Sequence, residues 1–118
     1  MKIPAEGKLL RIFIGEQDKW NGQPLHEAII HLAKKEGMAG ATAIKGFMGF
    51  GCKSRMHTTK LLRLSEDLPI IIEMVDSEEK INKFLPHLDE MVKEGLTTLE
   101  KVNVIMYRAS KTEKIIES

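Results

Sequence analysis

Apolar and polar residues follow two different periods along this chain, one typical of strands and one typical of helices. Residues 8–15 form a short apolar run with β-branched isoleucines, which favours a strand. A helical stripe then lies between Pro24 and Gly37, where proline suits a first turn and glycine suits a stop. Its apolar members are Leu25, Ala28, Ile29, Leu32 and Ala33. Residues 41–45 are mostly small and predict a second, short strand.

The second half of the chain repeats the alternation of strand and helix. Leu61, Leu62 and Leu64 are candidates for the start of a third strand, residues 65–67 interrupt it, and residues 68–75 are its strongest part. Pro69 fits best at an edge or at a strand start. Asp76 followed by Glu79 resembles a capping box and predicts the start of a second helix, which ends at Gly95. The apolar stripe of this helix is Ile81, Phe84, Leu85, Leu88, Met91 and Val92.

Two features near the C-terminal end complete the pattern. Pro86 removes the helical hydrogen bond to the carbonyl of Asn82, so we expect a kink or a break near Leu85. Residues 102–107 alternate between two faces and predict a fourth strand. Residues 110–118 form a charged tail.

The predicted order is strand, helix, strand, strand, helix, strand. Right-handed crossovers fold this order into an antiparallel four-stranded sheet with both helices on one face, which is the ferredoxin-like α+β fold. Trp20 precedes the first helix and is expected to plug the edge of the core.

Two of the strands are apolar on both faces. Residues 9–14 and 70–75 are apolar at nearly every position, with Arg11 and Glu73 as the exceptions. The simplest cover for the second sheet face is another copy of the chain. The alternative is that the long connection or the tail folds across that face. For Arg11 and Glu73 the pattern predicts a cross-strand ion pair or a contact between subunits.

Length and charge limit the classes of protein to consider. The chain has 118 residues, which predicts one domain over residues 1–118. Its 18 basic against 17 acidic residues give a net charge of +1, so no overall field attracts it to nucleic acid or to a membrane surface. One cysteine, Cys52, excludes an internal disulfide, and neither a long apolar run nor a signal segment is found. A cytoplasmic protein without membrane insertion is expected.

The connection at residues 45–60 combines glycines, phenylalanines and basic side chains. Glycines permit positive φ and close approach to a ligand, so successive N–H groups can converge on an anion. Connections of this length usually carry function. We therefore interpret the segment as a binding loop, with charge available from Lys53, Arg55, His57 and Lys60.

This segment resembles the PII nitrogen-regulatory proteins. Their Gly-Met, their strand ending Lys-Gly-Phe-Gly and their basic stretch ending His-Thr are similar to Gly37-Met38, Ala43-Ile44-Lys45-Gly46-Phe47 and His57-Thr58. From Leu9 to Met106 the chain also resembles the PII-like family known as domain of unknown function 190. One motif that carries this second resemblance is Leu64-Ser65-Glu66-Asp67-Leu68-Pro69.

The resemblance implies a ferredoxin-like subunit in a compact homotrimer, with small-molecule sites in the clefts between subunits. In PII proteins an adenine nucleotide lies in the cleft, held in part by the base of the long loop, whose outer part docks onto target proteins. The positions that match are Gly46 and Phe47 at the loop base, His57 and Thr58 at its return, Lys53 as a basic residue, and Arg108 as a phosphate-binding arginine.

The chain also departs from the PII pattern. Residues 94–101 keep one glycine and one lysine but lack the second glycine-rich loop that grips the distal phosphates of ATP in PII proteins. AMP, ADP or another small anion is therefore at least as good a candidate as ATP. Tyr107 lies in a predicted strand, so the chain has no loop-tip tyrosine for uridylylation.

These observations predict a PII-like regulatory protein, not an enzyme, that senses a small anionic metabolite. An adenine nucleotide is the best candidate effector, and no cofactor or metal is required. Gly46, Gly49 and Gly51 would supply backbone donors, Phe47 or Phe50 would stack on the base, and Lys53, Arg55 and Arg108 would neutralise phosphate. The ordered loop would then dock onto a protein target, either a transporter or an enzyme.

RNA binding is the main alternative. The RNA recognition motif shares the element order and stacks bases on a sequence similar to Lys45-Gly46-Phe47 and the residues that follow. Met48 breaks the alternation that would place both phenylalanine rings on one face, and the segment precedes the third strand. A metal site or a nucleophile at Cys52 and His57 lacks further paired ligands. A small enzyme would need an acid, base and nucleophile set, which the sequence does not display.

Overall fold

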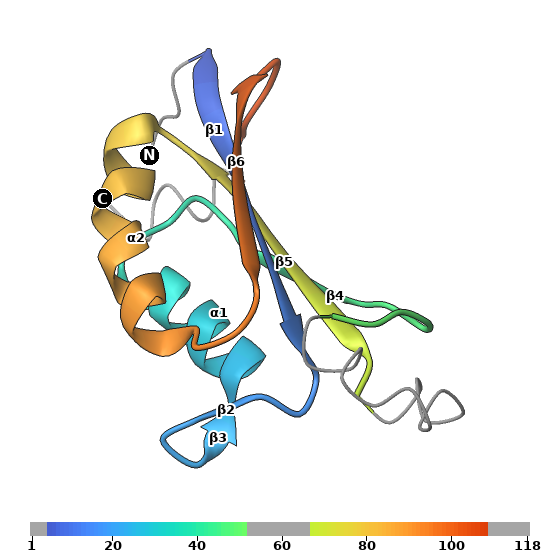
Figure 1. Ribbon diagram of the computed structural model, residues 1–118. Helices are drawn as coiled ribbons and strands as arrows, with labels where there is room; N and C mark the ends of the chain where they lie inside the picture. Colours follow the sequence, from blue (N-terminus) through green and yellow to red (C-terminus); the bar gives the residue numbers. More distant parts are fainter. Residues whose placement is uncertain (1–4, 52–66, 109–118) are drawn as a thin grey trace.

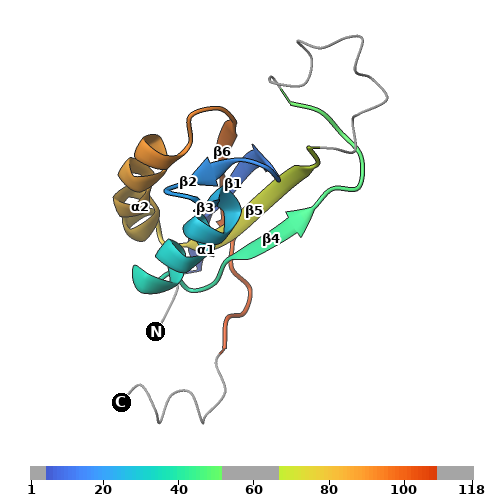
Figure 2. The same cartoon turned by 90° about the horizontal axis from the view of Figure 1, so that it is seen from below.

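The computed structural model describes residues 5–51 and 67–108 and contains two helices and a four-stranded antiparallel sheet. Both helices lie on one face of the sheet (Figures 1 and 2). The sheet order is β4-β5-β1-β6, which confirms the ferredoxin-like α+β fold. The elements are β1 (Glu6–Gly15), β2 (Lys19–Trp20), β3 (Gln23–Pro24), α1 (Leu25–Lys35), β4 (Thr42–Lys45), β5 (Pro69–Asp76), α2 (Glu78–Met91) and β6 (Leu96–Asn103).

Strand β1 is central, because it pairs antiparallel with both β5 and β6. Its alternate residues Leu10, Ile12 and Ile14 are buried beneath the helices. The residues between them point to the other side of the sheet and are only half-buried. Within residues 5–51 and 67–108, the chain therefore covers one face of its sheet and leaves the second face open.

The covered face holds one core. Each helix presents a stripe at helical spacing, as predicted, and the inward side chains of β1 and β5 fill the space between them. Trp20 packs partly buried against this core, at the edge expected from the sequence. The buried apolar residues are Leu10, Ile12, Ile14, Leu25, Ala28, Ile29, Ala33, Ile70, Ile72, Met74, Ile81, Phe84, Leu88 and Met91.

The second face, which we call the open face, carries apolar and charged rows. In the row nearest the end of β1, the register places Ile44, Ile71, Phe13 and Leu96 side by side. In the adjacent row Arg11 lies opposite Glu73, and its Nε donates to a Glu73 carboxylate oxygen at 2.8 Å. The predicted cross-strand ion pair is thus confirmed. Whether residues 52–66 or 109–118 cover this face lies outside the described residues.

A hairpin absent from the sequence-based prediction precedes α1. Strands β2 and β3 pair through Trp20 and Gln23 and are joined by Asn21 and Gly22, which have φ values of 51° and 81°. An Asn-Gly dipeptide is the usual signal for such a two-residue turn, because both positions require positive φ. Helix α1 then begins at Leu25 and ends at Lys35, just inside the predicted limits. Within the described ranges, neither helix has the length and apolar character needed to cross a membrane.

The predicted fourth strand at 102–107 was wrong in its limits. Strand β6 begins at Leu96, opposite Phe13, and ends at Asn103. Pairing with the central strand stabilises this polar segment as an edge strand, although its alternation of apolar residues is weak. Beyond it, the Val104 N–H still donates to the Ala5 carbonyl at 2.6 Å, but residues 104–107 form no strand.

Helix α2 differs from its prediction in two ways. It continues from Glu78 to Met91 through Pro86, so the predicted break near Leu85 is absent. Pro86 lies on the exposed side, where its ring meets solvent rather than packed side chains. The helix also ends at Met91, four residues before Gly95.

The predicted capping box at Asp76 and Glu79 is also wrong. Ser77 is the N-cap residue, and its hydroxyl accepts from the Lys80 N–H at 3.2 Å. Asp76 is instead the last residue of β5, 2% exposed, and joins three segments. One carboxylate oxygen accepts from Ser77 N–H at 2.7 Å and the other from Ala39 N–H at 2.8 Å.

Replacing Asp76 with alanine should lower the free energy of unfolding by about 2–3 kcal/mol, because two backbone donors lose their acceptor in a buried place. Urea unfolding at one fixed protein concentration measures the change. Asp89→Ala, which removes an exposed carboxylate from α2, is the control and should change stability by less than about 0.5 kcal/mol. Equal midpoints for the two variants would contradict the role given to Asp76.

Replacing Pro86 with alanine should raise the free energy of unfolding by roughly 1–3 kcal/mol, because α2 gains an N–H donor for the Asn82 carbonyl and a better helix former. The same urea experiment measures this gain. Lys83→Ala changes an exposed position of the same helix without adding a hydrogen bond and serves as the control. A less stable P86A protein would show that the helix depends on the proline.

Candidate functional site

The glycine-rich connection after β4 begins beside Pro69, the first residue of β5. The Gly46 N–H donates to the Pro69 carbonyl at 2.8 Å, which continues the β4–β5 pairing by one step. A Cβ atom on Gly46 would lie 2.8 Å from the Pro69 Cγ, so the close approach requires glycine here. The connection therefore leaves the sheet in a defined direction.

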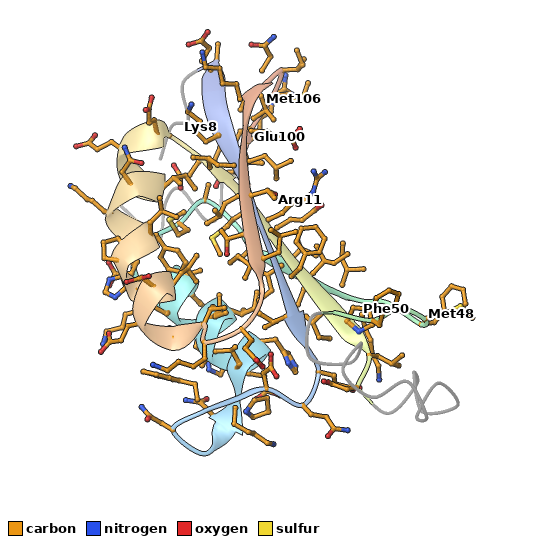
Figure 3. The ribbon with its side chains drawn as sticks, in the orientation of Figure 1. Lys8, Arg11, Met48, Phe50, Glu100 and Met106 are labelled. Atoms are coloured by element: carbon orange, nitrogen blue, oxygen red, sulfur yellow. The ribbon has the colours of Figure 1, made fainter. Side chains whose placement is uncertain are left out.

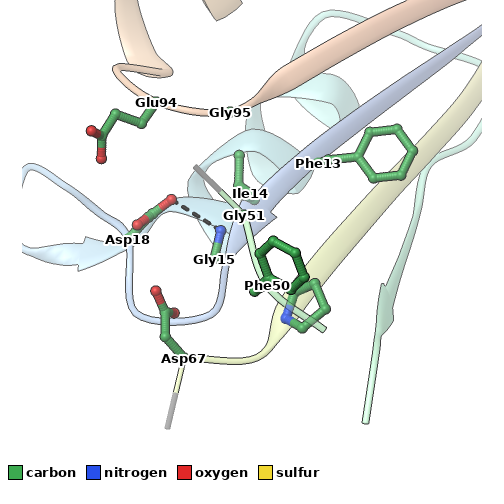
Figure 4. A pocket seen from close by; sticks show the side chains of 10 residues that line it. Phe13, Ile14, Gly15, Asp18, Phe50, Gly51, Asp67, Glu94 and Gly95 are labelled. Atoms are coloured by element: carbon green, nitrogen blue, oxygen red, sulfur yellow. Dashed lines mark hydrogen bonds between the residues drawn. The ribbon is translucent and has the colours of Figure 1, made fainter. Parts of the chain in front are cut away.

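A cavity of about 130 Å³ lies where this connection meets the ends of three strands (Figure 4). The end of β1, the start of β5 and the approach to β6 contribute its walls. Phe13 and Phe50 are among the residues that line it. The described residues that line it are Phe13, Ile14, Gly15, Asp18, Phe50, Gly51, Asp67, Pro69, Glu94 and Gly95.

Among the described residues, the charged ones that line the cavity are all acidic: Asp18, Asp67 and Glu94. Two of these carboxylates hold the turn after β1. One Asp18 oxygen accepts from the Gly15 N–H, and one Asp67 oxygen accepts from the Gln17 N–H, each at 3.0 Å. A phosphate group placed against these walls would be repelled. The cavity of the described chain thus suits an uncharged, flat group better than a phosphate.

Gly95 fixes the approach of β6 to this cavity. A Cβ atom there would lie 2.7 Å from the backbone oxygen of Phe13, and the φ of Gly95 is 156°. Glu94 and Gly95 belong to the segment that departs from the second glycine-rich loop of PII proteins. The structure nevertheless brings them to the same cavity as Phe50 and Gly51.

The predicted ligand residues fall into separate groups. Gly46, Phe47, Gly49, Phe50 and Gly51 lie in the described part of the connection, and of these only Phe50 and Gly51 line the cavity. Phe47 and Phe50 are 88% and 66% exposed. The remaining loop residues, Lys53, Arg55, His57 and Thr58, lie outside the described residues. Their roles stay predictions.

Arg108 is far from the cavity within one chain. Strand β6 starts near the cavity at Leu96 and runs to Asn103, opposite the beginning of β1. Arg108 follows at that opposite end, where Tyr107 donates from its hydroxyl to the Ala39 carbonyl at 3.0 Å. One subunit therefore does not bring Arg108 and Phe50 together.

The geometry gives little support to the other site hypotheses. Strand β4 ends at Lys45, so Phe47 and Phe50 lie beyond the sheet and do not form the stacking platform of an RNA recognition motif. Among residues 5–51 and 67–108, no group of three potential metal ligands is gathered. The Cys52 and His57 pair lies outside these ranges.

Sequence reasoning missed Asp18 and Asp67 as cavity residues. Each lies in a polar connection, where an aspartate is most often a turn residue, and each does bond to a turn N–H. Their meeting depends on the antiparallel pairing of Gly15 with Pro69, which joins segments more than fifty positions apart. Local patterns cannot reveal such a pairing.

Solved structures with a PII-like description share this fold. CPII from Thiomonas intermedia K12, bound to ADP, AMP and acetate, superposes with a TM-score of 0.61 at 19% identity, over 88% of this chain and 92% of CPII. A protein of Thermus thermophilus, described as a PII-like signaling protein, superposes with a TM-score of 0.59 at 20% identity, over 97% of this chain and 98% of its own. At these identities the likeness shows the fold.

Relatives with higher identity define the family. A UPF0166 protein of Aquifex aeolicus (strain VF5) is 39% identical over 98 residues, covering 83% of this chain and 92% of the relative. A UPF0166 protein of Methanocaldococcus jannaschii is 42% identical over 88 residues, covering 75% of this chain and 81% of the relative. Residues 7–104 match DUF190, described as "Uncharacterized ACR, COG1993", which confirms the resemblance seen in the sequence. The chain belongs to the DUF190 family.

Proposed function

We propose that this protein is a PII-like regulator that binds a small anionic metabolite, with an adenine nucleotide as the best candidate, in clefts between copies of the chain. The observation that carries the proposal is the cavity at the base of the glycine-rich connection, lined by Phe13 and Phe50. Its family and fold indicate a regulator rather than an enzyme. CPII, which shares the fold, binds ADP and AMP.

The base and the phosphates of the nucleotide would be held by different residues. The apolar cavity walls and the Phe50 ring accept the flat base, whereas the carboxylates of Asp18, Asp67 and Glu94 disfavour phosphate. Phosphate then depends on basic side chains supplied from elsewhere. Lys53 and Arg55 of the loop and Arg108 are the candidates, with Gly49 and Gly51 as backbone donors. The predicted donor role of Gly46 is wrong, because its N–H already donates to the Pro69 carbonyl.

Assembly through the open face would bring these residues together. Arg108 is remote from the cavity of its own chain, so only a neighbouring copy can supply this arginine to the site. Covering about 400 Å² of apolar surface per copy would contribute roughly 10 kcal/mol before association costs. A homotrimer is the assembly that we propose, and the phosphate would lie between two of its subunits.

Binding would be transmitted through the loop. A ligand that contacts both the cavity and residues 52–58 favours the loop conformations in which those contacts form. A difference of about 1–3 kcal/mol between loop states is enough to change the affinity of a partner. The target is a transporter or an enzyme in the cytoplasm, contacted by the outer part of the loop.

Calorimetric titration with AMP, ADP, ATP and a cyclic nucleotide tests the ligand. The double variant Lys53→Ala and Arg55→Ala should weaken ADP binding about 100-fold or more, because each of the two lost charge-assisted bonds costs roughly 1.5–3 kcal/mol. The matched control, Lys34→Ala with Lys35→Ala, removes two positive charges from α1 and should bind normally. If none of the four nucleotides produces heat with the wild-type protein, the adenine nucleotide proposal is wrong.

Phe50→Ala separates base recognition from phosphate recognition. Loss of the ring should weaken adenosine, AMP and ADP by a similar factor, about 5-fold to 100-fold, because a stacked base contributes roughly 1–3 kcal/mol. The same titrations measure this. The double lysine and arginine variant should instead leave adenosine binding unchanged. An F50A protein with full affinity for adenosine would remove Phe50 from the site.

Phe13→Glu tests assembly through the open face. A carboxylate in the apolar row beside Ile71 and Leu96 should convert trimers to monomers, because its burial without a partner is costly. Analytical ultracentrifugation gives the mass. His31→Glu adds the same charge to an exposed position on α1, on the helix side of the sheet, and should leave the mass unchanged. Trimers of the F13E variant would place the interface elsewhere.

A further inference from the structure

Among the described residues, the open face carries three charged side chains, and their charges do not sum to zero. Arg11 is the cation, and Glu73 and Glu100 are the carboxylates. The Arg11 Nε donates to Glu73 and one of its terminal nitrogens donates to Glu100, both at 2.8 Å. Figure 3 labels Arg11 and Glu100 among the side chains of the sheet. Each copy therefore contributes one excess negative charge to this face.

Arg11, Glu73 and Glu100 form a charged triad, and its neighbours on each strand are uncharged. The groups that share this face with the triad carry hydroxyl or apolar side chains, so none of them neutralises the second carboxylate. They are Thr42 and Ile44 on β4, Ile71 and Val75 on β5, Leu9 and Phe13 on β1, and Leu96, Thr98 and Val102 on β6. The lysines of these strands lie in the register of the helix-covered side: Lys8 opposite Asp76, Lys45 opposite Ile70 and Lys101 opposite Lys8.

The two carboxylates are not equivalent. Glu73 lies directly opposite Arg11 on the neighbouring strand, whereas Glu100 lies opposite Leu9 and reaches Arg11 diagonally. The Glu73 side chain is 35% exposed and that of Glu100 is 58% exposed. The hydrogen bond to Glu73 raises the pKa of Arg11, so the guanidinium remains charged. Glu100 is thus the carboxylate that loses most water when the face is covered.

We propose that self-association through the open face is coupled to proton uptake by Glu100, so that pH controls the strength of the assembly. This inference rests on the assembly proposed above. Covering the face removes Glu100 from water and brings it near the excess charge of a second copy, and both effects favour the protonated carboxyl. The excess negative charge of the triad therefore opposes assembly until Glu100 takes up a proton.

The direction of the pH effect on assembly follows from the burial of Glu100. Covering a carboxyl raises its pKa above the value that it has in the single chain, because burial disfavours the charged form. Assembly is therefore strengthened as pH falls and weakened as pH rises through the raised pKa. Between the two pKa values, the association constant changes by up to about tenfold per pH unit for each proton taken up.

Ultracentrifugation of the nucleotide-free protein between pH 5 and pH 8 tests the proposal. The wild-type association constant should rise as pH falls. Glu100→Gln should associate more tightly at pH 8 and lose most of the pH dependence, because Arg11 then balances Glu73 alone. The matched control, Glu90→Gln, removes the same charge from the exposed side of α2 and should keep the wild-type profile.

Arg11→Gln has the opposite effect to Glu100→Gln on the charge of the open face, because it removes the positive charge. It leaves two unbalanced carboxylates on the open face, so association should weaken at pH 8 and depend on pH more steeply than in the wild type. Far-UV circular dichroism at each pH verifies that the variants remain folded. If R11Q does not fold, the comparison of E100Q with E90Q decides the question.

Two outcomes would overturn the inference. A wild-type assembly that does not change with pH, or one in which E100Q and E90Q share the same slope, excludes Glu100 as the coupled group while leaving nucleotide binding intact. A protein that is monomeric at every pH and concentration overturns both this inference and the proposed assembly.

Discussion

The structure depends on one constraint: a four-stranded sheet that two helices cover on one face only. Strand β1 pairs on both sides, so its outward residues Leu9, Arg11 and Phe13 lie at the centre of the open face rather than at an edge. Apolar side chains in that position favour association, because the described part of the chain leaves them in contact with water. The same strand carries Leu10, Ile12 and Ile14 of the buried core. Folding and the proposed self-association would therefore both depend on one apolar segment.

Phe13 connects the open face with the candidate ligand site. It belongs to the apolar row shared with Ile71 and Leu96, and it is also one of the residues that line the cavity. A partner copy that packs on this row could shift this residue and with it the wall of the cavity. Ligand binding and assembly would thus share a residue, which is a physical basis for reciprocal coupling between them. No long-range signal through the core is needed for such coupling.

Much of the fold could be predicted from the sequence, because buried strands and amphipathic helices have strong periods. The limits of β6 could not, since its polar residues form a strand only by pairing with β1 in the register of Phe13 and Leu96. The role of Asp76 was missed for a similar reason: its acceptor contacts reach Ala39, which is close only in the folded chain. For the site, the sequence identified the glycine-rich connection, whereas Asp18 and Asp67 are brought together by strand pairing.

The described residues supply no positive charge to the walls of the candidate cavity. The described cavity has apolar and acidic walls, which suits a base and rejects phosphate, and the open face adds an excess carboxylate at Glu100. An anionic ligand must therefore draw its positive charge from the loop or from another copy. Once that charge is supplied across a subunit boundary, the ligand stabilises the assembly by binding to it more tightly than to a monomer. Protons and the anionic ligand would then act in the same direction, because each is bound more tightly by the assembly than by the single chain.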